Sequence, residues 1–348
     1  MSELHLVTGG AGYFGTRLVQ RLHCAGRRVR IFDINDAEER PAEVEMVRGD
    51  IRDLGAVRRA LEGASVVHHN VALVPLAKDN AAFWSVNRDG TRQLLEASLA
   101  AKVRKVVHMS SSAVFGAPDR NPVDDSTVPR PLEDYGRAKL AGESFCRDFA
   151  SRGLDVTILR PRTIMGHGRL GIMQILFEWV REGKNIPVLG RGDNLYQFVH
   201  ADDLADAAMK AAARPGPATY NIGAETFGTM RETLEGLVQH AGTASKVVSL
   251  PTGPAITMMN LTSRAGLSPL GSYHSLMYGR SMYFALDRAK QELEWAPRFG
   301  NVAMFCDSYD WYLQHREEVF LRRGASHHRS AVNQGILRAV GWALRFAA

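Results

Sequence analysis

A glycine-rich run after a short apolar segment limits the fold of this chain more than any other feature. Residues 4–8 (Leu-His-Leu-Val-Thr) have the length and apolar character of a buried parallel strand. Residues 13–24 then carry apolar side chains at helical spacing. Between the two segments, Gly9, Gly12 and Gly15 permit a tight turn, close approach of the backbone to a phosphate, and close packing of helix on strand. The sequence therefore predicts a strand–turn–helix unit whose helix N-terminus binds an anion such as a dinucleotide pyrophosphate.

An acidic residue at the end of the next expected strand supports a dinucleotide site. This strand covers residues 29–33 and ends at Asp33, eighteen residues after Gly15, close to the spacing of about 20 expected for a ribose-binding carboxylate. A carboxylate there accepts hydrogen bonds from the adenosine ribose hydroxyls and repels a 2′-phosphate, so NAD is favoured over NADP. Nearby arginines would weaken that preference: Arg27, Arg28 and Arg30. Without the strand, the helix and the acid, the glycine run would fit an ordinary turn equally well.

A tyrosine and a lysine further along the chain have the spacing of a proton-transfer pair. Tyr135 and Lys139 are four residues apart, so they face the same side of a helix expected over residues 134–150. A free tyrosine has a pKa of about 10, and a neighbouring ammonium lowers that pKa by favouring the phenolate. Tyr135 would then remove a proton from a substrate hydroxyl, or donate one to a ketone, during hydride transfer with a nicotinamide. The alternative is a chance spacing on a solvated helix.

Many further motifs follow in a fixed order through residues 4–315. They are Thr-Gly-x-x-Gly-x-x-Gly at 8–15, Gly-Asp-Ile at 49–51, Val71-Ala72, Asn87, Ser-Ser-Ser-Ala-Val-Phe-Gly at 110–116, Tyr-Gly-Arg-Ala-Lys at 135–139, Leu-Arg-Pro at 159–161, Phe-Val-His-Ala-Asp-Asp at 198–203 and Tyr-Asn-Ile-Gly at 220–223. In this order they resemble the extended short-chain dehydrogenases/reductases, also called the NAD-dependent epimerase/dehydratase family. The resemblance covers most of the chain, and it implies an enzyme with NAD as its cofactor.

The resemblance also implies roles for individual residues. Ser111 would hold the substrate oxygen opposite Tyr135, and Lys139 would also hold the nicotinamide ribose. Ser112 would line the substrate pocket. A polar turn is the plain alternative for the serines. The residues expected to contact NAD are Gly9, Gly12, Tyr13, Phe14, Gly15, Asp33, Asp50, Ile51, Val71, Ala72, Asn87, Tyr135, Lys139 and Pro161.

The order of expected elements predicts an α/β fold. Strands alternate with helices through the first half, which is typical of a doubly wound parallel sheet of the Rossmann type. We expect residues 1–165 to form the NAD-binding domain, with residues 198–223 returning to it by resemblance. A smaller substrate-binding part would cover residues 166–315, including a helix around residues 173–180. The substrate would lie between the two parts, outside the carboxyl ends of the strands.

The substrate class follows from what the motifs lack. Dehydratases of the family commonly carry an Asp-Glu pair where this chain has Ser112-Ala113, so dehydration is disfavoured. Many sugar-nucleotide epimerases carry a diphosphate-binding arginine just before the Phe-Val-His stretch, where this chain has Asn-Leu-Tyr-Gln at 194–197. Arg191 or Arg280 would have to replace it, because a guanidinium suits phosphate oxygens. The core motifs favour a glycosyl diphosphate epimerase. The close alternative is a dehydrogenase of a 3β-hydroxysteroid or related lipid alcohol, for which residues 267–283 would supply a hydrophobic region.

A third interpretation belongs to another class, a non-catalytic NAD-binding sensor. Sensors of this kind often lose the tyrosine or the lysine, whereas this chain keeps both Tyr135 and Lys139. No spacing of His, Cys and carboxylates predicts a metal site, and Cys24, Cys146 and Cys306 are isolated, as in a reducing compartment. A small-molecule substrate and a homodimer are expected, and nucleic acid is not, because no recognition motif accompanies the basic residues.

The last 33 residues, 316–348, carry much of the positive charge. They hold six arginines against two glutamates, a net +4 of the +6 of the whole chain. Residues 336–344 place apolar side chains on one helical face, so the tail would either lie on an anionic membrane surface or pack on the body or a second subunit. The start of the chain lacks the pattern of a signal peptide, and no stretch reaches about 18 apolar residues. We therefore expect a cytoplasmic protein, peripheral at a membrane if the tail binds one.

Overall fold

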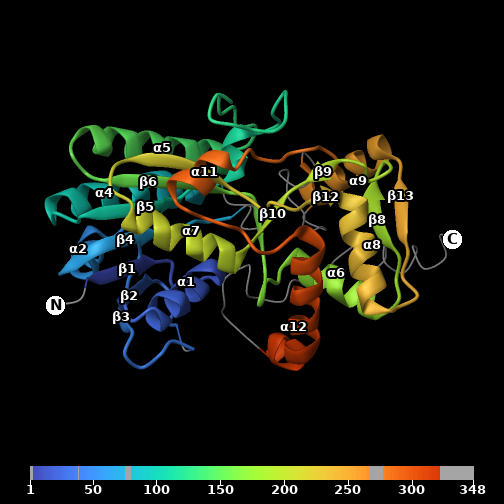
Figure 1. Ribbon diagram of the computed structural model, residues 1–348, viewed down its shortest axis with the longest axis horizontal. Helices are drawn as coiled ribbons and strands as arrows, with labels where there is room; N and C mark the ends of the chain where they lie inside the picture. The colour runs from blue at the N-terminus through green and yellow to red at the C-terminus, as the bar shows by residue number, and fades with distance from the viewer. Residues whose placement is uncertain (1–2, 38, 75–79, 266–276, 322–348) are drawn as a thin grey trace.

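The largest element of the fold is a seven-stranded parallel sheet (Figure 1). The computed structural model describes residues 3–37, 39–74, 80–265 and 277–321. The strand order is β11-β6-β5-β4-β1-β2-β3, and every neighbouring pair is parallel. The strands are β1 (Leu4–Thr8), β2 (Arg28–Asp33), β3 (Glu45–Arg48), β4 (Ala64–His69), β5 (Lys105–Met109), β6 (Val156–Pro161) and β11 (Ala218–Ile222). This arrangement confirms the predicted α/β fold of the Rossmann type.

Successive apolar side chains on the strands feed two cores, one on each face of the sheet. In β1, Val7 packs into one core and Leu6 into the other, and β5 divides Val107 and Val106 in the same way. This is the period of two expected for a strand that is buried on both faces. Parallel strands need crossover connections, and helices supply them here.

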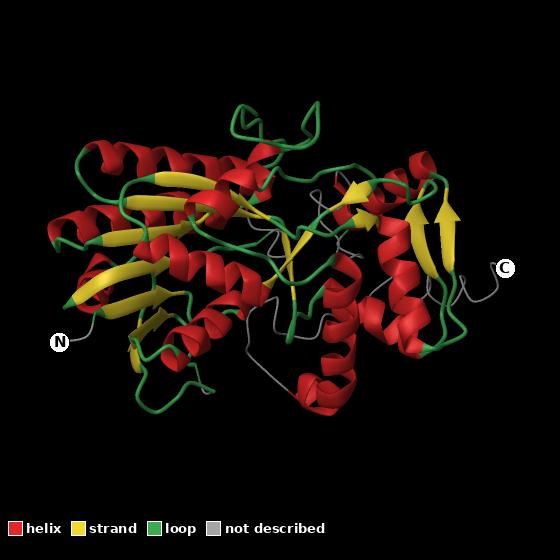
Figure 2. Ribbon diagram, in the orientation of Figure 1, coloured by secondary structure: helices red, strands yellow, loops and turns green. Residues whose placement is uncertain are grey.

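Helices cover both faces of the sheet (Figure 2). On one face α1 (Tyr13–Cys24) packs against α7 (Ala201–Ala213). Successive contacts on the other face run from α2 to α4, from α4 to α5, and from α5 to the π-helical segment η2. The elements in this series are α2 (Leu54–Leu61), η2 (Phe83–Gly90), α4 (Thr91–Ala100) and α5 (Asp134–Ser151), and the short α3 (Asn80–Ala82) leads into η2. The predicted segments at residues 4–8, 13–24 and 134–150 thus correspond to β1, α1 and α5.

A smaller C-terminal part has its own core, rich in aromatic side chains such as Phe177, Phe198, Phe305 and Tyr312. Its strands form two-stranded sheets: β7 (Thr163–Met165) with β10 (Phe198–His200), β8 (Ile186–Leu189) with β13 (Val247–Leu250), and β9 (Leu195–Tyr196) with β12 (Gly228–Thr229). The helices of this part are α6 (Ile172–Arg181), α8 (Met230–Ala241), α9 (Thr252–Arg264) and α12 (Asn301–Leu321), whereas α11 (Asp287–Glu292) packs against β11 of the large sheet. The helix predicted around residues 173–180 corresponds to α6.

The segment Phe198–Asp203 joins the two parts. His200 caps α7, with its side chain accepting a hydrogen bond from the backbone N–H of Asp202. Asp202 pairs with Arg17 of α1, and Asp203 accepts hydrogen bonds from the backbone N–H groups of Arg298 and Phe299. These contacts give the segment a structural role, and the chain then returns to the sheet edge through β11.

The first residues of the expected tail belong to α12. Arg316 pairs with Glu178 of α6, which also accepts a hydrogen bond from Tyr312. Burial of Glu178 alone would raise its pKa, but Arg316, Arg181 and Tyr312 outweigh that effect and lower the pKa to about 2. The expected amphipathic helix over residues 336–344 lies outside the described residues, as does most of the hydrophobic region at 267–283. No described helix has the length and apolar character needed to span a bilayer.

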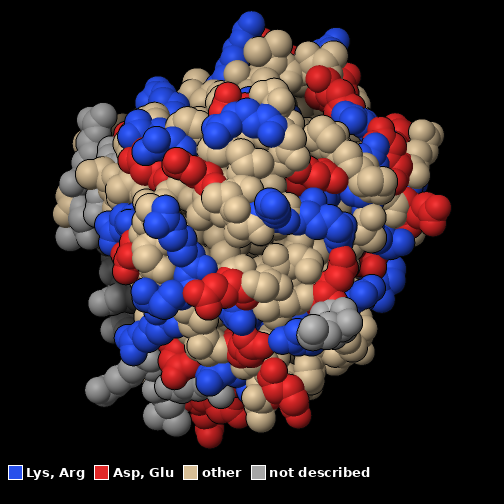
Figure 3. Space-filling view, turned by 90° about the vertical axis from the view of Figure 1, so that its left-hand side faces the viewer, with Lys and Arg blue, Asp and Glu red and all other residues tan. Residues whose placement is uncertain are grey.

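Charges are mixed on the face at the sheet end of the molecule (Figure 3). Basic and acidic side chains alternate across this view, without a continuous area of one sign. Among the described residues, Arg28 and Arg30 pair with Glu45, and Arg104 pairs with Glu3. The pairing directs Arg28 and Arg30 to Glu45 on β3, and neither side chain lines the cavity described below.

Candidate active site

A cavity of about 1220 Å³ opens along the carboxyl edge of the sheet. The strand order reverses on either side of β1, because the chain first adds β2 and β3 to one side and then β4 to the other. In open α/β sheets such a reversal leaves a crevice where ligands bind. The turns after β1, β4, β5 and β6 line the cavity here, and α6, β8, α8 and α9 of the smaller part close its far side.

The glycine run shapes the cavity wall after β1. Gly9 has φ +69°, a conformation that side chains rarely adopt. A Cβ on Gly15 would collide with the carbonyl oxygen of Gly9, so only glycine allows α1 to start this close to β1. Gly12 is the N-cap of α1 and carries no side chain, so the first turn of the helix has no side-chain cap. This cradle of backbone at a helix N-terminus fits a dinucleotide pyrophosphate.

Asp33 lies at the end of β2, buried in the same wall. Its Oδ2 accepts a hydrogen bond from the backbone N–H of Ala11 at 3.1 Å, and its Oδ1 accepts one from Asn35 at 3.0 Å. Burial raises its pKa, and these backbone donors oppose the shift. The hydrogen bond to Ala11 ties the carboxylate to the glycine turn, and Asp33 lines the cavity there.

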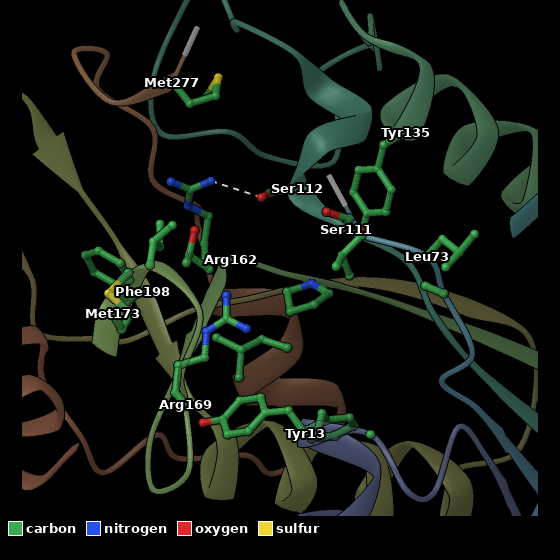
Figure 4. Close-up of a pocket in the computed structure, with 18 of the residues that line it drawn as sticks. Tyr13, Leu73, Ser111, Ser112, Tyr135, Arg162, Arg169, Met173, Phe198 and Met277 are labelled. Carbon is green, nitrogen blue, oxygen red and sulfur yellow. Dashed lines mark hydrogen bonds between the residues drawn. The ribbon is translucent and has the colours of Figure 1, made fainter. Parts of the chain in front are cut away.

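Ser111, Tyr135 and Lys139 line the cavity from two elements, and Figure 4 shows Ser111 beside Tyr135. Ser111 follows β5 and caps the short helix η3 (Ser112–Phe115), accepting a hydrogen bond from the N–H of Ala113 at 3.2 Å. Tyr135 lies in the first turn of α5, where the N-cap Glu133 accepts hydrogen bonds from the N–H groups of Tyr135 and Gly136. Lys139 follows one turn later. All three residues line the cavity.

Burial controls the charges of this group. Lys139 is 1% exposed, donates a hydrogen bond to the carbonyl oxygen of Met109, and has a pKa lowered to about 8 by burial. Burial, with a contribution from the Lys139 charge, lowers the pKa of His69 to about 3 and that of His108 well below its usual value. Both imidazoles are therefore neutral at neutral pH, so neither adds a positive charge beside the Lys139 ammonium.

The pKa of Tyr135 shifts in the direction opposite to the one expected from its spacing to Lys139. Burial raises it to about 12, and the Ser111 hydroxyl only partly offsets that effect. The physical reason is that the desolvation of the phenolate outweighs the nearby charges. In the described protein the phenol is thus protonated at neutral pH.

Most residues predicted to bind cofactor or substrate line this cavity. They are Gly9, Gly12, Tyr13, Phe14, Gly15, Asp33, Asp50, Ile51, Val71, Ala72, Ser111, Ser112, Tyr135, Lys139 and Pro161. Asn87 does not line it. Its side chain instead exchanges two hydrogen bonds with the backbone of Leu73, at 2.8 and 2.9 Å, and so holds the loop after β4 that does.

The two arginines proposed to replace a diphosphate clamp do not reach the cavity. The side chain of Arg191 is 87% exposed and pairs with Asp193, and Arg280 is also exposed. Arg162 and Arg169 line the cavity instead. Neither was singled out from the sequence, although Arg162 directly follows the Leu-Arg-Pro motif.

The far side of the cavity is apolar. From residue 172 onward, no described residue that lines it carries a charge. The side chains come from four separate elements and include Leu176, Trp179, Val188, Leu234, Met258 and Met259. Among the residues that the structure describes, no group of three or more His, Cys, Asp and Glu side chains could hold a metal ion.

Comparisons with known proteins agree with this geometry. The sequence model of the NAD dependent epimerase/dehydratase family matches residues 5–223. The chain is 52% identical to Uncharacterized protein y4nG of Sinorhizobium fredii, over 98% of this chain and 86% of that protein. It is 28% identical to a UDP-glucose 4-epimerase of Streptomyces lividans, over 90% of this chain and 98% of that protein. The structure of MoeE5 in complex with UDP-glucose and NAD superposes with a TM-score of 0.74 at 27% identity, over 90% of this chain and 100% of that one.

Proposed function

Because this chain belongs to the NAD-dependent epimerase/dehydratase family, we propose that it oxidises a secondary alcohol with Ser111, Tyr135 and Lys139. It is an NAD-dependent enzyme of the short-chain dehydrogenase/reductase type, and its substrate is a small molecule. The proposal rests on one observation: these three side chains line the same cavity as the glycine turn and Asp33. When bound, NAD supplies the hydride acceptor and, in its oxidised form, a positive charge. The glycine turn and Asp33 are the groups that would hold it.

The three side chains divide the work on the substrate hydroxyl. Ser111 holds the substrate oxygen by a hydrogen bond, and Tyr135 exchanges a proton with that oxygen. With a pKa of about 12, Tyr135 is ready to donate a proton to a ketone. In the oxidising direction it must first lose that proton. By family resemblance, Lys139, whose pKa burial lowers to about 8, would supply the positive charge that stabilises the phenolate as it forms.

The leading substrate candidate is a glycosyl diphosphate, with the alcohol returned in the opposite configuration. The UDP-glucose 4-epimerase relatives and the UDP-glucose complex of MoeE5 support this candidate, as do the Ser111–Gly116 and Tyr135–Lys139 motifs in the sequence. An epimerase would show no net change in the redox state of its cofactor.

A lipid alcohol is the second candidate, with net dehydrogenation to a ketone. The apolar far side of the cavity favours it, as does the arginine-free segment Asn-Leu-Tyr-Gln at 194–197. One NADH would then accumulate for each substrate molecule that is oxidised. A 3β-hydroxysteroid is a suitable test compound, because it carries a secondary alcohol on a rigid apolar body.

The decisive experiment compares Tyr135→Phe with the wild-type protein. We expect turnover of UDP-glucose, UDP-galactose or a 3β-hydroxysteroid to fall by about 10²–10⁴-fold, the usual contribution of a positioned acid–base group. NAD affinity should stay within twofold of wild type, roughly the scatter of such measurements. Tyr283→Phe is the matched control, because Tyr283 lies outside the cavity lining. Unchanged turnover in Tyr135→Phe would remove Tyr135 from this role.

The assembly and location of the protein are also proposals. By family resemblance we propose a homodimer, and by its charge and pattern we propose that the tail contacts an anionic membrane surface. Arg316 is committed to Glu178, so only the residues after α12 are available for this contact. Sedimentation of the full chain tests the dimer. Flotation with phosphatidylglycerol vesicles, compared with a chain ending at Leu321, tests the tail.

A further inference from the structure

Two arginines in the cavity have no carboxylate partner among the described residues. Arg162 follows Pro161 at the end of β6, and Arg169 lies in the loop between β7 and α6. Both guanidinium groups lie in the cavity near the serines and Tyr13 (Figure 4). Buried arginines ordinarily pair with acids, because an uncompensated charge away from water is unfavourable. The missing partner is the observation that calls for an explanation.

Arg162 is held rigidly but is not fully satisfied. It is 1% exposed, and its Nη1 donates a hydrogen bond to Ser112 Oγ at 3.0 Å, while its Nε donates one to the carbonyl oxygen of Gln197 at 3.1 Å. Its guanidinium carbon lies 4.6 Å from the ring centroid of Tyr196. The Nη2 group has no hydrogen-bond acceptor among the described residues. A planar donor group fixed in this way is preorganised to bind an oxyanion.

Arg169 gives the site a second positive charge. Its Nε is likewise buried without an acceptor among the described residues, and its guanidinium lies 5.5 Å from the ring centroid of Tyr13. Burial lowers its pKa, and the phenols of Tyr13, Tyr278 and Tyr135 oppose that shift. Arg169 therefore lies beside Tyr13, at the start of α1 (Figure 4).

Among the described residues, the lining beyond Arg169 has few polar side-chain groups, which are those of Tyr196, Thr262 and Tyr278 and the indole N–H of Trp179. Beyond Arg169 the described lining is uncharged, and Leu176, Trp179, Leu234 and Met259 make it apolar. Met258 of α9 lines the cavity and is also 59% exposed, so the apolar wall continues to the surface there. A nucleotide base would find few side-chain partners in such a wall, whereas a hydrocarbon group would gain from leaving water.

We propose that the substrate is an anionic amphiphile, with a carboxylate or phosphate group bound by Arg162 and Arg169 and a hydrocarbon group against the apolar wall. This inference rests on the proposed function, the oxidation of a secondary alcohol, and within it favours the lipid alcohol, the second candidate, over a nucleotide sugar. Arg162 donates a hydrogen bond to Ser112, the neighbour of Ser111, which holds the substrate oxygen in the proposed reaction. The anionic group would therefore lie near the alcohol that is oxidised.

Calorimetry on the full-length protein saturated with NAD tests the proposal. The ligands are decyl phosphate, decanoate, decanol, inorganic phosphate and UDP-glucose, each below its aggregation concentration. We expect decyl phosphate or decanoate to bind at least tenfold more tightly than both decanol and inorganic phosphate. The two alkyl anions distinguish a phosphate from a carboxylate. Decanol binding as tightly as either anion would overturn the anionic site, and UDP-glucose binding without alkyl-anion binding would overturn the apolar part.

Variants assign the two halves of the site. Arg162→Met should abolish the tenfold preference for the anion, and Arg162→Lys should retain part of it. Leu176→Arg should weaken both decyl phosphate and decanol. NAD affinity and the unfolding midpoint check that each variant folds. If Arg162→Met does not fold, the same ligands are titrated into Arg169→Met, which should also lose the preference for the anion. A preference that survives in both methionine variants would contradict the proposal.

The outcome separates this inference from the proposed chemistry. Tyr135→Phe should bind decyl phosphate and decanoate as the wild type does, because the phenol is not part of the anion site. Failure of turnover to depend on Tyr135 would leave these binding results standing, and loss of the anion preference would leave the acid–base role of Tyr135 standing.

Discussion

The two sides of the cavity are built in different ways. On the sheet side, the wall consists of turns at the carboxyl ends of parallel strands, and backbone geometry at Gly9 and Gly15 sets its shape. On the far side, the wall consists of side chains from α6, β8, α8 and α9, with no charge among those described. The sheet side can hold the same cofactor only if a few positions keep their residues. The far side can change its substrate by exchanging one apolar side chain for another.

This difference suits an enzyme that keeps its chemistry while its substrate varies. A pyrophosphate needs a fixed set of backbone donors and a helix N-terminus. A hydrocarbon group needs only volume and the absence of water. Arg162 and Arg169 lie at the border between the two walls, where the proposed anion would be held. The following predictions test whether the two walls respond independently.

The largest expected effect is on the sheet side, at Gly15. In Gly15→Ala the added Cβ would collide with the carbonyl oxygen of Gly9, so α1 must move away from β1. We expect NAD binding, measured by calorimetry, to be lost. Gly253→Ala in α9 is the matched control, because a Cβ there meets nothing within 4 Å. Wild-type NAD affinity in Gly15→Ala would contradict the proposed pyrophosphate cradle.

The second largest expected effect is a loss of stability on changing the core of the smaller part. Phe177 is fully buried against Tyr309 and Tyr312, and Phe177→Ala should lower the free energy of unfolding by about 3–5 kcal/mol. Phe320→Ala is the control at a 48% exposed phenylalanine and should change it by about 0.5 kcal/mol or less. Urea denaturation measures both. If the walls are independent, the folded Phe177→Ala protein binds NAD normally. A loss of NAD affinity in parallel with stability would show that the smaller part supports the cofactor site.

The same contrast explains which features could be predicted from the sequence. Gly9, Gly15 and Asp33 were predictable because their roles depend on local backbone geometry and on a short spacing along the chain. Tyr135 and Lys139 were predictable because one helical turn places them together. The apolar wall was not, because its residues come from four elements far apart in the sequence and look like ordinary core positions.

Single polar residues were the hardest to predict. Arg191 was chosen because a guanidinium suits phosphate oxygens, but it follows the turn at Gly190, and its side chain is exposed and pairs with Asp193. Arg162 was passed over although it lines the cavity, as Arg169 does. Asn87 supports the cofactor wall through the Leu73 backbone rather than lining it. In each case the direction of one side chain decided the outcome, and a sequence motif does not contain that direction.

The smallest expected effects come from two helix caps, one on each side. Asp53 accepts hydrogen bonds from the N–H groups of Gly55 and Ala56 at the start of α2. Thr229 forms a capping box with Glu232 at the start of α8. Each change to alanine should cost about 1 kcal/mol of unfolding free energy in urea, because a capping hydrogen bond is local wherever the helix lies.

Ligand binding should nevertheless distinguish the two cap variants. The first turn of α8 carries Met230, which lines the cavity, whereas α2 contributes no residue to the lining. Loss of the Thr229 cap loosens that turn. Thr229→Ala should therefore bind decyl phosphate about two- to fivefold less tightly, a change in binding free energy comparable to or smaller than the stability lost with the cap. Asp53→Ala should bind both decyl phosphate and NAD as the wild type does. Equal ligand affinities in the two variants would mean that the first turn of α8 is not part of the substrate wall.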